Sequence, residues 1–167
     1  MQQAGAFTPL RDGRLRATTR EEADDDTFTG PFVVPLRNVL RFADPRYGDP
    51  WGVGDITNED VLAEVECPDV VTDCTHDESA GYDGCRVCEI RRVAHFVTYG
   101  IDWSDEHPIS IDVGFEAYVP PWPVADGNHR LLAAAVRGDE LVAVEVAGDW
   151  DRAIALFIDG DDIDDLL

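Results

Sequence analysis

The sequence predicts a single domain with an α+β fold, on three observations. Apolar residues recur at helical spacing in some segments and alternate in others, and the two kinds of segment follow one another in mixed order. The chain has 167 residues, of which 44 % are apolar, so it can bury the core of one domain. It also lacks an internal repeat. We expect a flexible arm over residues 1–29, a single domain over 30–158 and an acidic tail over 159–167.

In the first half of the chain, turn-forming residues separate a strand pattern from a helical one. We expect a strand over residues 32–36, in an edge or terminal position because its proline has no N–H to donate to a neighbouring strand. Residues 44–52 are dense in Pro, Gly and Asp and predict a loop. A helix is expected over residues 58–66, where Thr57 or Asn58 can cap its first turn.

The second half of the chain shows clearer periodicity. An apolar stripe at spacings of three and four predicts a helix over residues 85–99, with Gly100 as its C-cap. Residues 109–113 alternate between apolar and polar side chains, which is typical of a strand. A second strand is expected over residues 140–146, where Val142, Val144 and Val146 fall on one face. Two more helices are expected, one opening at Asp126 and closing at Gly138, and one over residues 150–158.

The charge balance limits the classes of partner. Asp and Glu total 35 against 13 basic residues, all of them Arg, which gives a net charge of −22. One interpretation is a halophilic protein, whose acidic surface stays hydrated in a salt-rich cytoplasm. The other is an acidic protein that binds a basic protein partner, for example as a nucleic-acid mimic. Direct binding of nucleic acid through a general basic surface is disfavoured by either interpretation.

The sequence also bears on location. It contains no apolar run near the roughly 18 residues that span a bilayer, and its polar N-terminal segment does not resemble a secretory signal. We therefore expect a cytoplasmic protein that does not enter a membrane.

The segment Asp126-Gly127-Asn128-His129-Arg130 carries the chemistry most typical of a ligand site. A chain entering a helix presents unpaired backbone N–H groups, and the helix dipole adds partial positive charge. Gly127 allows close approach of a ligand, while His129 and Arg130 add a titratable ring and a bidentate donor. These groups suit a phosphate, and Asp126 could cap the helix or bind Mg²⁺. The alternative is a capped helix whose His129 and Arg130 pair with nearby carboxylates.

A strand, the Asp-Gly-Asn-His-Arg turn, an Ala-rich helix ending in Gly138 and a Val-rich strand together resemble the ParB/sulfiredoxin-like superfamily. The resemblance implies a small mixed sheet with packed helices and a nucleotide-phosphate site at the turn. The superfamily includes a free-serine kinase and proteins described as ParB-like nucleases. Sulfiredoxins have a catalytic Cys where this chain has Asn128. The motif is closer to that of the free-serine-kinase-like and uncharacterised branches.

From this resemblance we expect a domain that binds a nucleotide with Mg²⁺, or a phosphorylated small molecule, and that could catalyse phosphoryl transfer or phosphodiester hydrolysis. Backbone N–H groups from Gly127 to His129, including Asn128, would hold phosphate oxygens, and Trp122 could stack on a base. Arg130 would neutralise charge, His129 would orient phosphate or shuttle a proton, and Asp126 or Asp112 would bind Mg²⁺ or act as base. The alternatives are a non-enzymatic interaction protein that keeps the fold and a zinc-stabilised regulatory module.

Four cysteines lie close together in the sequence, within a Cys-rich insertion over residues 67–88. Cys67, Cys74, Cys85 and Cys88 have the spacing C-x6-C-x10-C-x2-C, and the second pair is typical of a metal knuckle at a helix start. A structural Zn²⁺ would organise a loop that has few apolar residues. His76 could replace Cys74 as a ligand, and disulfides or unlinked thiols remain alternatives.

Overall fold

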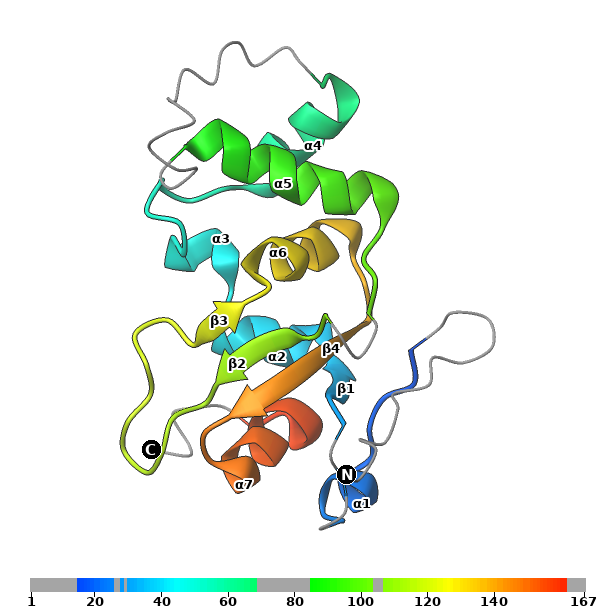
Figure 1. Cartoon of the computed structure of the whole chain (residues 1–167), viewed down its shortest axis with the longest axis vertical. Helices are drawn as coiled ribbons and strands as arrows, with labels where there is room; N and C mark the ends of the chain where they lie inside the picture. Colours follow the sequence, from blue (N-terminus) through cyan, green and yellow to red (C-terminus); the bar gives the residue numbers. More distant parts are fainter. Residues whose placement is uncertain (1–14, 26–27, 29, 69–84, 104–106, 162–167) are drawn as a thin grey trace, which may run out of the picture. The chain divides into compact units, whose positions relative to one another are not determined.

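The structure is a computed structural model that describes residues 15–25, 28, 30–68, 85–103 and 107–161 (Figure 1). Its residues form two compact units. Unit 1 comprises Met1–Ala43, Asp102–Gly127 and Asp139–Leu167, and unit 2 comprises Asp44–Ile101 and Asn128–Gly138. The segment expected to form one domain therefore contains two units, and each unit is built from more than one stretch of the chain.

Unit 1 is built on a four-stranded mixed sheet, which confirms the α+β class. The strand order is β1-β4-β2-β3, where β1 is Phe32–Pro35, β2 is Ile109–Asp112, β3 is Val124–Asp126 and β4 is Leu141–Ala147. Strand β4 pairs antiparallel with β1 and parallel with β2, and β2 pairs antiparallel with β3. Because β1 lies at the edge of the sheet, its proline costs no ladder hydrogen bond, as the sequence predicted.

Helices cover the sheet of unit 1. Phe32, Val33 and Val34 of β1 are all at most 1 % exposed, so this strand is buried on both faces. It leads directly into α2 (Leu36–Phe42), which packs on a C-terminal helical segment made of α7 (Trp150–Ala153) and the π-helix η2 (Ile154–Asp159). The helix expected over residues 150–158 is therefore present, with π-helical bonding in its second half.

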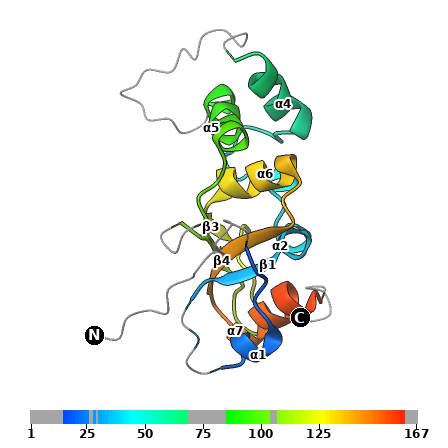
Figure 2. The same cartoon turned by 90° about the vertical axis from the view of Figure 1, so that its right-hand side faces the viewer.

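The N-terminal segment differs from the expected flexible arm over its described residues. Thr19 and Glu22 form a reciprocal capping box that starts the short helix α1 (Arg20–Ala23). The indole nitrogen of Trp150 donates a hydrogen bond to the carbonyl of Ala23 at 3.2 Å, and Thr18 N–H donates to the carbonyl of Val33 at 2.7 Å. Both views place α1 in the lower part of unit 1, near α7 (Figure 2). The segment expected to be a flexible arm thus includes a short helix that is hydrogen-bonded to α7, and Thr18, just before this helix, is bonded to β1.

A tight turn follows β2. Gly114 has a φ of +72°, and a Cβ added there would lie 1.9 Å from the carbonyl oxygen of Tyr118, so only glycine fits. The buried guanidinium of Arg152 donates hydrogen bonds to the carbonyls of Val113 at 3.1 Å, Tyr118 at 3.3 Å and Glu116. One side chain of the C-terminal helix therefore satisfies three carbonyls of this turn.

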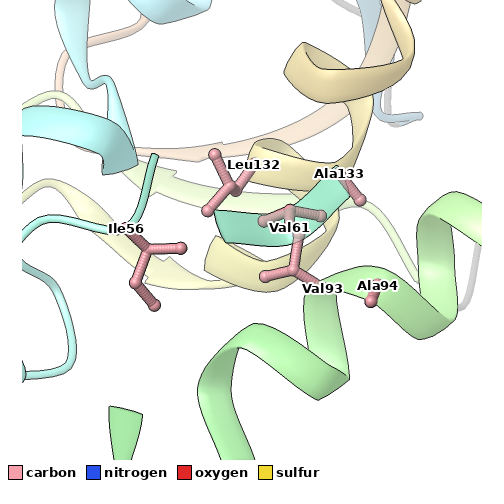
Figure 3. Packing of buried hydrophobic residues seen from close by; sticks show 6 residues of the cluster. All are labelled: Ile56, Val61, Val93, Ala94, Leu132 and Ala133. Atoms are coloured by element: carbon pink, nitrogen blue, oxygen red, sulfur yellow. The ribbon is translucent and has the colours of Figure 1, made fainter. Parts of the chain in front are cut away.

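Unit 2 is helical. It contains α3 (Pro45–Gly48), α4 (Asn58–Glu66), α5 (Arg86–Tyr99) and α6 (Asn128–Arg137), and α5 packs on both α4 and α6 (Figure 1). The three longer helices enclose an apolar cluster, shown in Figure 3, that consists of Ile56, Val61, Val93, Ala94, Leu132 and Ala133.

The predicted helix boundaries in unit 2 are largely confirmed. Thr57 is the N-cap of α4, where it forms a capping box with Asp60, and Gly100 is the C-cap of α5. Helix α6 begins at Asn128 rather than at Asp126, where it was expected to open. A further exception is the segment expected to be a loop over residues 44–52. It holds the one-turn helix α3, because Asp44 caps the turn and Pro45 occupies its first position.

None of the helices within the described ranges combines the length and apolarity needed to cross a membrane.

Candidate functional site

The Asp-Gly-Asn-His-Arg segment leads from strand β3 into helix α6. Asp126 was expected to open the helix, but it is the exposed last residue of β3. Gly127 has a φ of +92°, outside the helical region, and α6 begins at Asn128. Gly127 therefore precedes the helix directly.

The first turn of α6 has no acidic residue and carries His129 and Arg130. Helices α1, α4, α5 and α7 each have an acidic residue in their first turn, where it interacts favourably with the helix dipole. Helices α2 and α3 resemble α6 in having no acidic residue and one arginine there, but neither has a histidine beside it. Cationic side chains at this end of a helix add to the positive end of the dipole, and together they attract an anion.

His129 is held by a buried carboxylate of the neighbouring helix. Its Nε2 atom lies 2.5 Å from Oε2 of Glu89 in α5, and the Glu89 side chain is only 3 % exposed. Arg92, one turn further along α5, lies 3.4 Å from each carboxylate oxygen of Glu89. The carboxylate thus interacts with two cationic or ionisable groups, as burial of a charge requires.

A second contact orients the imidazole ring. Trp51 stacks on His129 with ring centroids 4.9 Å apart and an interplanar angle of 29°. One edge of the imidazole is therefore bonded to Glu89 and one face is covered by an indole. A ring held in this way has a defined orientation at the helix start, which a surface histidine lacks.

The other predicted phosphate and Mg²⁺ residues lie in different surroundings. Asp112 ends β2, and its Oδ1 accepts a hydrogen bond from Gly114 N–H at 2.8 Å, so it stabilises the turn after the strand. Trp122 is half-buried shortly before β3, in unit 1 with Asp126. The structure brings His129 together with Glu89 and Trp51, two residues that the sequence did not single out.

The cysteines flank the helices of unit 2. Cys67 is the exposed C-cap of α4, Cys85 is the N-cap of α5 and Cys88 lies in the first turn of α5. Cys74 and His76 lie outside the described residues. Among the residues that are described, no three His, Cys, Asp or Glu side chains group as metal ligands. The second cysteine pair does begin a helix, as expected for a knuckle, and structural zinc stays a prediction.

Comparison with known proteins does not add a relative: no protein-family model matches the chain, and neither a curated protein nor a solved structure matches it.

The sequence contained a weak signal for the two missed residues. Glu89 lies between two apolar residues, Cys88 and Ile90, in the expected helix, but a glutamate in a helix is usually expected to face solvent. Trp51 lies in a segment rich in turn formers. Each gains its role from a residue far along the chain: Glu89 and His129 are separated by 40 positions.

Proposed function

We propose that this chain is a ParB/sulfiredoxin-like domain that binds the phosphate group of a nucleotide, or of a phosphorylated small molecule, at the start of α6. The observation that carries the proposal is His129, which a buried carboxylate and an indole orient in the first turn of a helix without acidic residues there. The order β3, glycine turn, α6, Gly138 and β4 supports the resemblance on which the family assignment rests.

Binding would use three kinds of donor. Backbone N–H groups at the start of α6 would hold phosphate oxygens, aided by the helix dipole. The guanidinium of Arg130 would form a bidentate contact with two oxygens. The His129 ring would donate a further hydrogen bond. Asp126, next to Gly127 in the chain, is the residue that we propose for contact with a nucleotide-bound Mg²⁺.

The same groups suit phosphoryl transfer or phosphodiester hydrolysis. Catalysis of either reaction depends mainly on positioning the phosphate and neutralising its developing charge, which are the tasks of Arg130 and the helix start. His129 would carry a proton to or from an oxygen of the ligand, a common role of histidine in general acid–base catalysis.

The binding step can be tested by calorimetry. We would titrate the protein with ATP, ADP, CTP and GTP in the presence of Mg²⁺, in ordinary buffer and in molar KCl, since an acidic surface favours a protein adapted to salt. Arg130→Ala should weaken binding by about tenfold or more, because a charge-assisted hydrogen bond contributes about 1.5–3 kcal/mol. The matched control is Arg37→Ala, which removes the same charge from the exposed face of α2.

The outcomes separate the two functional classes. Saturable binding that Arg130→Ala removes and Arg37→Ala preserves would support the phosphate site. Folded protein that binds none of the nucleotides in either buffer would contradict it. The acidic surface would then favour the non-enzymatic interaction protein.

A further inference from the structure

We propose that Glu89 is the positioning residue of this site: it fixes the ring of His129, so that a phosphate meets the imidazole in a fixed direction. The proposal deepens the phosphate-binding function and rests on it for the identity of the ligand. Glu89 itself would not touch the ligand, because its side chain is buried and acts through His129.

The buried carboxylate of Glu89 requires hydrogen-bond donors and opposite charges around it. A carboxylate that is 97 % hidden from solvent is costly unless hydrogen bonds and opposite charges compensate it. Here the 2.5 Å contact with His129 and the two 3.4 Å contacts with Arg92 provide that compensation. In the contact with His129, Nε2–H donates to the carboxylate, which can only accept while it is ionised.

The charge of Glu89 affects an anion bound near His129. On its own, Glu89 would repel a phosphate. Arg92, on the same helix, offsets that charge. Glu89 can therefore orient the ring while Arg92 offsets the repulsion between its carboxylate and an anion at the first turn of α6.

The indole of Trp51 restricts the ring as well. It stacks on His129 at a centroid distance of 4.9 Å, as offset-stacked aromatic rings do. The stacking hinders rotation of the imidazole about its bond to Cβ. Glu89 and Trp51 thus restrict the same ring from two directions.

The first measurement needs no ligand. Nitrogen-detected NMR of the imidazole in the full chain, assigned with His129→Gln, reports whether Nε2 carries a proton and how fast that proton exchanges with water. We expect a protonated Nε2 with slow exchange in the unmodified chain, and exchange at least tenfold faster in Glu89→Gln. Glu59→Gln, an exposed glutamate on α4, is the matched control and should leave the ring signals unchanged.

The second measurement uses inorganic phosphate as the probe. Glu89→Gln should weaken phosphate affinity by about tenfold, and by no more than His129→Gln does, because Glu89 acts only through the ring. Glu59→Gln should bind phosphate as the unmodified chain does. Thermal melts of each variant establish that the variants compared are folded. If Glu89→Gln does not fold, Glu89→Asp, which keeps the charge but withdraws it from the ring, replaces it.

The results distinguish the two proposals. Altered ring signals in Glu89→Gln together with weaker phosphate binding would support both. Altered ring signals in a chain that binds no phosphate or nucleotide would support the positioning role and contradict the proposed function. An Nε2 without a slowly exchanging proton in the unmodified chain, or phosphate affinity unchanged by Glu89→Gln, would overturn the role of Glu89.

Discussion

The substitution Arg152→Met would test how the turn between β2 and β3 is held. Arg152 is 7 % exposed, and its guanidinium donates to the carbonyls of Val113, Glu116 and Tyr118. Methionine keeps most of the apolar stem and removes only the donors. At roughly 1 kcal/mol net for each hydrogen bond, the substitution should lower the free energy of unfolding by about 3 kcal/mol.

Urea denaturation followed by circular dichroism, in molar KCl, would measure that change. The matched control is Arg37→Met on the exposed face of α2, which removes the same charge and should change stability little. A loss below about 1 kcal/mol for Arg152→Met would refute the reasoning, because it would mean that water replaces the guanidinium at those carbonyls without cost.

Two further predictions concern unit 2. Leu132→Ala should lower the free energy of unfolding by about 2–5 kcal/mol, because Leu132 is fully buried in the cluster of Figure 3; a loss below 1 kcal/mol in urea denaturation would contradict that packing. Burial acts to raise the pKa of Asp60, but hydrogen bonds from Thr57 and the guanidinium of Arg86 outweigh it, so the pKa lies below its usual value. The carboxylate therefore stabilises the fold above its unfolded pKa and loses that effect as the pH falls through its folded pKa. Asp60→Asn should accordingly reduce stability at pH 7 and have a smaller effect at pH 2, as measured by thermal melts; an equal effect at both pH values would contradict the linkage.

Elements with local signals were predictable from the sequence. Thr57 and Gly100 mark the ends of α4 and α5 through contacts with residues a few positions away. The edge position of β1 followed from Pro35, because a missing N–H is a local property. In these places the residues that determine the structure lie within the element itself.

Elements without local signals were missed. Helix α2 follows β1 directly, and its N-cap position is Pro35, which makes no side-chain hydrogen bond to the helix. The apolar stripe predicted for α5 comprised Val87, Ile90, Ala94 and Val97. Of these Ala94 is buried, but Val93, which lies outside the stripe, is buried completely. The reason is that α5 packs on two helices, so its buried surface is broader than one stripe.

The candidate site was predictable only in part. The sequence indicated His129 and Arg130 at a helix start, and the structure places both in the first turn of α6. It could not indicate Glu89, because the reason for burying a carboxylate is a partner that folding brings from 40 positions away. Long-range pairs of this kind need the tertiary structure.

The central claim is that a phosphate binds at the start of α6, and amide chemical-shift mapping tests it most directly. Inorganic phosphate would be titrated into the nitrogen-15-labelled chain at constant ionic strength. The account predicts saturable shifts that are largest for the N–H groups of Asn128, His129 and Arg130. Shifts confined to the arginine-rich segment over residues 11–20, with none at the start of α6, would contradict it.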